Sequence, residues 1–301
     1  MYTDFLKEIA FYMKQEDIKT DELMSKHTSF RVGGPAKVFL TVHSEEILKQ
    51  IFFALKKYHL PYFVLGNGSN LLVSDEGYDG VMVYLGEEFS QVEVIGTTIR
   101  AKAAALLGKV ARMAMEGELA GLEFAAGIPG SLGGGVVMNA GAYGGELSQV
   151  VTKVRAMNPD GEIVELEKDE LKLGYRTSIF KSQAFVILEV IMELKKGNRE
   201  EILAKMKEYT NARVEKQPLE YPSAGSTFKR PEGHFAGKLI MDAGLRGYRV
   251  GDAQVSEKQC GFVITRGNAT ATQIRTLMKD VAEKVEKEFG VELEPEVILL
   301  G

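Results

Sequence analysis

The chain has 301 residues, which is long for a single hydrophobic core and favours two or three domains. Hydrophobic residues make up 45% of the chain and charged residues 26%, an ordinary balance for a soluble globular protein. The formal net charge of -5 argues against a nucleic-acid partner, because proteins that bind nucleic acids usually display a basic face.

The sequence predicts no membrane span, no signal peptide and no metal site. No apolar run approaches the ~20 residues of a membrane span, and the acidic N-terminus has no signal-peptide cleavage site. Cys260 is the only cysteine, which excludes an internal disulfide and suits a reducing cytoplasm. The four histidines are scattered, without the spacing of metal ligands. We therefore expect a cytoplasmic protein that does not rely on metal catalysis.

The N-terminal part of the chain predicts a β-α-β unit. Residues 4–16 carry an apolar stripe at helical spacing and predict a helix before it. Residues 36–42 predict a strand, and Ser44 predicts the N-cap of a helix with a buried face. Residues 62–65 predict a second strand that leads directly into a glycine loop. The two strands could be parallel, with a right-handed crossover.

Short strands dominate the middle of the chain, and helices return after residue 198. Apolar runs between residues 71 and 102 alternate with Asp, Glu and Gly turns, as in strands. Asn158 to Gly161 predicts a hairpin turn. Further helices are expected at 105–116, 200–217, 235–243 and 270–288, and further strands at 184–194, 259–264 and 291–299. The order predicts an α+β chain with a boundary at residues 197–198.

A glycine-rich segment, Gly121 to Glu146, carries nine glycines in an apolar context. A flexible linker would be polar, so the composition suggests backbone pressed closely against a neighbour. Ser131 could open a short helix behind a phosphate loop. No Gly-Lys-Ser/Thr follows, and Pro129 stands where a nucleophile elbow needs glycine. The alternative is a tightly packed domain crossover.

A second glycine loop, Gly66 to Asn70, lies between two apolar strands. Consecutive amides in such a turn can form a nest for a diphosphate, with Ser69 and Asn70 as additional donors. Leu71 occupies the third glycine position of the dinucleotide fingerprint, so a Rossmann fold is not supported. The alternative is a surface turn. Together the two segments suggest amides arranged around a phosphorylated cofactor.

Three polar side chains could carry chemistry. Arg176, in the segment GYRTS, could hold a carboxylate in a bidentate grip, or it could form a surface ion pair. Ser226 lies between two prolines in a segment with basic groups, which could be a rigid loop of a site or a domain-connecting turn. Glu296 lies in an otherwise apolar terminal strand. Because buried carboxylates are costly unless paired, it either faces solvent or serves a site.

Seven motifs occur in a fixed order along the chain: TSFRVGG, GNGSNLLV, GLEFAAGIPGSLGGGVVMNAGAYG, GYRTS, SAGSTFKRP, AGKLIMDAGLRG and EPEV. Together they resemble those of the UDP-N-acetylenolpyruvoylglucosamine reductase family, over roughly residues 25–301. These flavoenzymes complete UDP-N-acetylmuramate in peptidoglycan synthesis. The chain resembles the shorter, type II form, because GYRTS is followed within a few residues by the strand at 184–194, leaving little room for a lid tyrosine insertion.

The resemblance implies a fold and a cofactor. An N-terminal helical segment (1–29) would precede an FAD-binding domain of the vanillyl-alcohol-oxidase (PCMH) type at 30–197, with subdomains of about 30–70 and 71–197, and a C-terminal α/β substrate domain at 198–301. FAD would be non-covalent, because neither glycine segment carries His or Cys, and NADPH would reduce it. The implied FAD contacts are Gly66, Asn67, Gly68, Ser69, Asn70, Ala126, Gly127, Gly130, Ser131, Gly133, Gly134, Asn139, Ala140 and Gly141.

The resemblance also implies catalytic roles. Arg176 and Glu296 would stabilise negative charge on the substrate carboxylate, and Ser226 would donate a proton to the adjacent carbon, with Lys229 as a source of positive charge. The implied substrate contacts are Tyr175, Lys216, Lys229 and Arg230, in a monomer or weak oligomer. Two alternatives are another flavin oxidase of the same superfamily and a non-catalytic flavin or sugar-nucleotide carrier.

Overall fold

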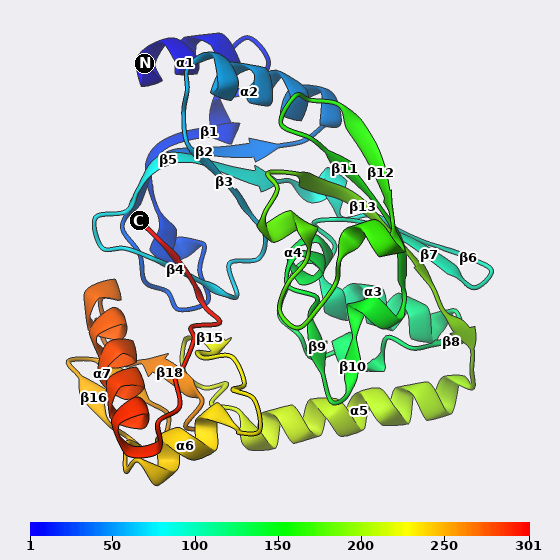
Figure 1. Cartoon of the computed structure of the whole chain (residues 1–301). Helices are drawn as coiled ribbons and strands as arrows, with labels where there is room; N and C mark the ends of the chain where they lie inside the picture. Colours follow the sequence, from blue (N-terminus) through cyan, green and yellow to red (C-terminus); the bar gives the residue numbers. More distant parts are fainter. The chain divides into compact units, whose positions relative to one another are not determined.

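Two units, each with its own hydrophobic core, make up the chain (Figure 1). The computed structural model describes all 301 residues. The first unit comprises residues 1–20, 38–67 and 80–212, and the second comprises residues 21–37, 68–79 and 213–301. Both combine helices and sheets, so the predicted α+β class is confirmed. None of the helices is both long and apolar enough to cross a membrane.

The predicted β-α-β elements are present. The hydroxyl of Ser44 accepts a hydrogen bond from the Ile47 amide at 3.2 Å and caps α2. Strand β5 lies between the two predicted strands and pairs with β3 in parallel, so β2 and β3 are not neighbours. The sheet has the order β1 (Ile18–Leu23), β2 (Pro35–Val42), β5 (Tyr78–Leu85) and β3 (Tyr62–Leu65), and α2 (Glu45–Lys57) connects β2 to β3.

The N-terminal helix is shorter than predicted. Helix α1 spans Tyr2–Ile9, whereas the apolar stripe predicted a helix over residues 4–16. Phe5 and Ile9 are fully buried and Met13 packs in the same core, but Tyr12 is 45% exposed. The helix ends at Ile9, and the chain continues through a turn and a short 3-10 helix, Gln15–Asp17, to β1.

A second sheet of the first unit is antiparallel throughout. The predicted turn at Asn158 joins β11 to β12, and the Gly161 amide donates to the Asn158 carbonyl at 3.0 Å. Helix α4 (Leu132–Val137) packs against β7 and β13, which places the glycine-rich segment beside this sheet. The order is β12 (Ile163–Glu167), β11 (Val151–Met157), β13 (Val186–Glu193), β7 (Thr98–Lys102) and β6 (Val92–Ile95).

The remaining elements of the first unit are helices and short strand pairs. The predicted helix at 105–116 is α3 (Leu107–Glu116), and α5 (Arg199–Lys216) begins in this unit and ends in the second. The short pairs are β8 (Leu119–Ala120) with β14 (Lys195–Lys196), and β9 (Gly141–Ala142) with β10 (Gly145–Glu146).

The second unit contains a four-stranded antiparallel sheet and two helices. Its terminal strand β19 spans only Ile298–Leu300 and pairs in parallel with β4 (Leu71–Val73). The strand predicted at 291–299 is therefore too long, and Glu296 precedes the actual strand. The sheet has the order β15 (Ser223–Ser226), β18 (Phe262–Thr265), β17 (Ala253–Val255) and β16 (Arg249–Val250), and the helices are α6 (Ala236–Asp242) and α7 (Ala271–Phe289).

Helix α7 has a second cap from a distant residue. The Asp75 carboxylate accepts hydrogen bonds from the amides of Ala271 and Thr272 at 2.7 and 2.8 Å, in addition to the capping box of Thr270 and Gln273. Burial alone would raise the pKa of Asp75, but the hydrogen bonds from Thr272 and Ala271 outweigh it and lower that pKa. The carboxylate therefore caps the helix in its charged form.

Asp75→Ala is expected to lower the free energy of unfolding by about 1–2 kcal/mol, because two helix amides lose their acceptor. Urea unfolding at neutral pH measures the change. The neighbouring Glu76→Ala is the control, since no hydrogen bond or ion pair of the Glu76 side chain is present in the structure and it should stay within about 0.5 kcal/mol of the wild type. Equal effects of the two substitutions would contradict the capping role.

His43 makes the stability of the first unit depend on pH. Its Nδ1 lies 2.6 Å from Glu88 and its Nε2 lies 2.9 Å from Asp17, and these hydrogen bonds, that of Glu88 first, raise the pKa of His43 above 6.5. The charged imidazole therefore stabilises the fold below pH 6.5, and this contribution is lost as pH rises through the raised pKa. We expect the melting-temperature gap between wild type and His43→Gln to shrink from about pH 6 to pH 8.5. His234→Gln, at an exposed histidine, should show no such trend.

Candidate active site

The two glycine segments meet inside the first unit. The Asn67 side-chain amide donates a hydrogen bond to the Pro129 carbonyl. A Cβ atom on Gly66 would lie only 2.6 Å from the Ser131 hydroxyl, so the approach requires glycine. Ser131 caps α4, as predicted, by accepting from the Gly134 amide at 3.4 Å. Asn67 and Pro129 are 62 residues apart in the sequence, and the fold joins the two segments at residues 66–67 and 129–131.

The loop from Gly66 to Asn70 has the donors that a diphosphate needs. None of its five backbone amides has a hydrogen-bond acceptor in the protein. Gly68 adopts φ +60°, and a Cβ there would lie 1.9 Å from the His27 carbonyl oxygen. Backbone amides left without acceptors in a glycine turn are a suitable cradle for phosphate oxygens. These residues therefore fit the diphosphate of FAD.

Several glycines of the segment 121–146 contact the protein itself. A Cβ on Gly133 would lie 2.9 Å from that of Ala103, and a Cβ on Gly145 would lie 2.5 Å from the Phe124 ring. Gly141 is crowded in the same way by the Gly145 carbonyl, at 2.7 Å. By contrast, a Cβ on Gly134 would meet only the Ser131 hydroxyl, at 3.3 Å. Tight packing within the protein thus explains part of the glycine content. Fewer glycines of this segment are left to make room for a ligand than the sequence suggested.

Asn139 links this segment to the turn that carries Arg176. Its side chain is fully buried, and its amide donates to the Gly174 carbonyl at 3.0 Å and accepts from the Ser148 amide at 2.9 Å. Both ends of the side-chain amide are therefore engaged by the protein. The other predicted contacts of this segment are Ala126, Gly127 and Gly130, in the turn before Ser131, and Ala140, whose backbone bonds Gly135 and Leu147.

Arg176 occupies a strained position. Its φ of +53° lies in the left-handed region, which long side chains rarely adopt. The turn is closed by two backbone hydrogen bonds between Gly174 and Thr177, at 3.1 and 3.2 Å. The guanidinium donates to the Gly141 carbonyl at 3.3 Å and lies 5.2 Å from the ring centre of Tyr175, which is 53% exposed. The turn therefore directs the arginine towards the glycine-rich segment of its own unit.

Ser226 and Glu296 are neighbours in the second unit. The Glu296 amide donates to the Thr227 carbonyl at 2.8 Å, which brings the C-terminal segment alongside the end of β15. A register shift in β15, with Gly225 at φ +76°, leaves Ser226 exposed at the strand end. The Asn70 side chain donates to the Glu296 carbonyl at 3.0 Å. One end of the glycine loop thus holds the backbone of the predicted catalytic glutamate.

Thr227 is a residue that the sequence did not single out. It is 1% exposed, its amide donates to the Gly261 carbonyl at 2.8 Å, and its hydroxyl accepts from the Val263 amide at 2.9 Å. With its carbonyl bonded to Glu296, Thr227 joins three chain segments. In the sequence it is one more small polar residue beside Ser226, so no local pattern could have identified it.

The motif TSFRVGG also has a structural role that the sequence left open. The Ser29 hydroxyl donates to the Ser223 carbonyl at 2.6 Å, and its amide donates to the Gly68 carbonyl at 3.0 Å. Ser29 therefore fixes Gly68, in the part of the glycine loop that belongs to the second unit, relative to the strand that carries Ser226.

The predicted substrate-binding cations differ in their surroundings. The Lys229 ammonium lies 2.6 Å from the Glu294 carboxylate, and this ion pair lowers the pKa of Glu294. The positive charge of Lys229 is therefore balanced locally, which weakens it as an aid to proton transfer from Ser226. The Arg230 guanidinium lies 4.6 Å from the ring centre of Phe235, and Lys216 is exposed at the end of α5.

Comparisons with known proteins match two family models to the chain. Residues 36–167 match the model of an FAD binding domain, and residues 217–300 match the C-terminal domain of UDP-N-acetylenolpyruvoylglucosamine reductase. The reductase of Agathobacter rectalis is 50% identical over 313 residues, covering 100% of this chain and 99% of its own. That of Clostridium tetani is 46% identical, with 100% and 97% covered.

Solved structures support the same family and the wider fold. The crystal structure of the Thermus caldophilus reductase gives a TM-score of 0.82 at 36% identity, covering 94% of this chain and 99% of that one. The 4-ethylphenol oxidase of Gulosibacter chungangensis gives 0.51 at 14% identity, with 98% and 65% covered, a likeness of fold alone. The chain therefore belongs to the UDP-N-acetylenolpyruvoylglucosamine reductase family, with an FAD-binding domain and a C-terminal domain of that family.

Proposed function

We propose that this chain is an FAD-containing, NADPH-dependent reductase that converts enolpyruvyl-UDP-N-acetylglucosamine to UDP-N-acetylmuramate for peptidoglycan synthesis. Family membership supports the reaction. The observation that carries the proposal is the hydrogen bond from the Glu296 amide to Thr227, with Asn70 bonded to the Glu296 carbonyl. These bonds hold the backbone of Glu296 alongside Thr227, the residue after the proposed proton donor Ser226, and next to a loop whose amides suit a diphosphate.

Three residues of the chain would stabilise charge on the substrate and donate the proton, while the cofactor supplies the hydride. When bound, FAD supplies the hydride that is added to the terminal CH2 carbon of the enolpyruvyl group. Arg176 would pair with the substrate carboxylate through its planar fork, and Glu296, in its protonated form, would support the same charge. Ser226, exposed at the end of β15, would donate a proton to the adjacent carbon. Because a serine hydroxyl is a weak acid, this role needs a proton relay or nearby positive charge.

Binding roles follow from charge and exposure. Tyr175 and the cations Lys216, Lys229 and Arg230 would contact the substrate, with Lys216 and Arg230 at its diphosphate. We assign residues 30–197 to the FAD-binding domain and residues 198–301 to the substrate-binding domain. Residues 1–29 form the N-terminal helical segment of this assignment. The enzyme would be a monomer or weak oligomer that binds FAD non-covalently. It would act on its small-molecule substrates in the cytoplasm.

The two half-reactions test the proposal. Purified protein should be yellow, lose its flavin absorbance with NADPH in the absence of oxygen, and regain it when the enolpyruvyl substrate is added. An oxidase would regain its colour with oxygen and ignore the enolpyruvyl substrate. A flavin or sugar-nucleotide carrier would not be bleached by NADPH. Either result would overturn the proposed reaction.

A further inference from the structure

A cleft of about 630 Å³ opens in the second unit, away from the residues assigned above. Two arginines, Arg31 and Arg266, line it together with Tyr221 and Asn268, and no acidic residue is among its lining. Neither Ser226 nor Glu296 belongs to it. Its volume falls within the range of about 300–1,000 Å³ typical of small-molecule sites.

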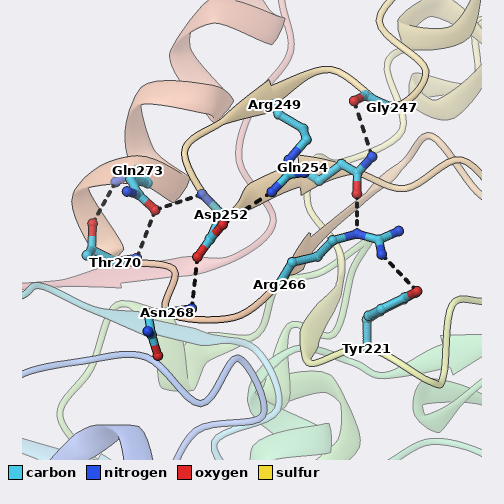
Figure 2. A network of polar contacts seen from close by, with 9 residues as sticks. All are labelled: Tyr221, Gly247, Arg249, Asp252, Gln254, Arg266, Asn268, Thr270 and Gln273. Carbon is cyan, nitrogen blue, oxygen red and sulfur yellow. Dashed lines mark hydrogen bonds and ion pairs between the residues drawn. The ribbon is translucent and has the colours of Figure 1, made fainter.

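Arg266, which lines this cleft, is held by hydrogen bonds to two side chains (Figure 2). Its Nε donates to the Gln254 side chain, and another guanidinium nitrogen donates to the Tyr221 hydroxyl at 2.9 Å. The guanidinium carbon also lies 4.2 Å from the centre of the Tyr221 ring. Gln254 is 5% exposed and is itself bonded to the Gly247 carbonyl at 3.2 Å. A buried side chain therefore fixes the arginine, unlike an ordinary mobile surface arginine.

The positive charge of the two arginines is not compensated. Neither Arg31 nor Arg266 forms an ion pair with a carboxylate. The one carboxylate of the surrounding network, Asp252, accepts from the Asn268 amide at 2.9 Å and pairs with Arg249 at 3.2 Å (Figure 2). It does not line the cleft. Two guanidinium groups beside a concave surface attract anions, particularly those with several oxygen acceptors.

The cleft lies at the far end of the strand pair that carries Ser226. Ser226 is opposite Phe262, whereas the Thr265 amide donates to the Pro222 carbonyl at 3.0 Å at the other end. Because β15 has a register shift, the regular partner strand gives the better measure: three residues from Thr265 to Phe262, at about 3.3 Å each, correspond to roughly 10 Å. A ligand in the cleft would therefore occupy a place separate from Ser226.

We propose that this cleft is a second binding site of the protein, for a small molecule that carries a phosphate or diphosphate group. The Tyr221 hydroxyl accepts from Arg266 and so keeps its own proton for a ligand, and the Asn268 side-chain amide adds further donors. Three chain segments supply hydrogen-bond donors to the cleft: Arg31, Tyr221, and Arg266 with Asn268. Together they offer more donors than the two oxygens of a flat carboxylate can accept. A tetrahedral phosphate with several oxygens matches them better.

Calorimetric titration of the FAD-loaded protein with inorganic pyrophosphate tests the site. We expect Arg31→Gln to raise the dissociation constant of pyrophosphate at one class of binding sites about tenfold or more, because a charged hydrogen-bond donor is lost. Arg31→Gln should fold normally, since its side chain makes no hydrogen bond in the structure, and Arg266→Gln should weaken the same class. Arg249→Gln is the matched control, because it removes an arginine that is paired with Asp252 and does not line the cleft.

Other outcomes would overturn the assignment. If Arg31→Gln binds pyrophosphate as the wild type does, the cleft is not the site. If Lys216→Gln removes the same class of binding, the pyrophosphate occupies the substrate region instead. If malonate, a flat dicarboxylate, binds in the cleft and pyrophosphate does not, the phosphate class is wrong. Should Arg266→Gln fail to fold, the comparison of Arg31→Gln with Arg249→Gln decides.

Discussion

Ser226→Ala is expected to slow flavin reoxidation by the enolpyruvyl substrate by about 10²- to 10⁴-fold, while flavin reduction by NADPH stays near the wild-type rate. Proton donation to the substrate belongs only to the second half-reaction, so loss of the hydroxyl should leave the first one intact. The Ser226 backbone should keep its place, because Thr227 next to it is anchored by Gly261 and Val263. Stopped-flow absorbance of the flavin measures both rates on the same protein.

A serine on the same strand supplies the control for this experiment. Ser223 takes part in the fold through its backbone carbonyl, which accepts from the Ser29 hydroxyl at 2.6 Å, and Ser223→Ala retains that carbonyl. Both half-reactions of Ser223→Ala should therefore match the wild type. If Ser226→Ala slows both half-reactions equally, the substitution has disturbed flavin binding and the proton-donor role is wrong. Wild-type reoxidation in Ser226→Ala would exclude the role as well.

Local patterns in the sequence predicted most elements of the fold. Ser44 caps a helix, and Asn158 begins a hairpin turn, because both depend on side chains a few residues away. The errors arose where distant partners decide the outcome. The N-terminal helix ends at Ile9 because the following residues join a sheet, and the terminal strand is restricted to the three residues that pair with β4.

The connections of the candidate site could not be predicted from the sequence. The motifs and the family resemblance led to Ser226, Glu296 and Arg176, whose roles stay predictions. The sequence could not reveal that Thr227 joins Glu296 to β18, since that bond spans about seventy residues. It also could not separate glycines that suit a ligand from Gly145, whose missing side chain makes room for Phe124. Both facts depend on neighbours that only the folded chain provides.

Arg176→Lys is expected to reduce turnover with the enolpyruvyl substrate by about 10²-fold or more, because one ammonium cannot replace the planar guanidinium fork on a carboxylate. Lysine and arginine share the same cost of a φ near +53°, so the melting temperature should remain close to that of the wild type. Thermal unfolding and steady-state turnover measure the two properties. Wild-type turnover in Arg176→Lys would exclude a bidentate role.

The strained backbone of Arg176 permits a sharper test. Glycine adopts φ +53° without the cost of roughly 1–2 kcal/mol that an L-side chain carries there. Arg176→Gly should therefore lose turnover and yet melt at or above the temperature of Arg176→Lys. Lys172, exposed at φ +47°, is the matched position: Lys172→Gly should also raise the melting temperature but keep wild-type turnover. A loss of stability in Arg176→Gly together with a gain in Lys172→Gly would mean that Arg176 holds the fold rather than the substrate. A gain of stability in both variants, with turnover lost only in Arg176→Gly, would mean that the chain tolerates strain at residue 176 because the reaction requires an arginine there.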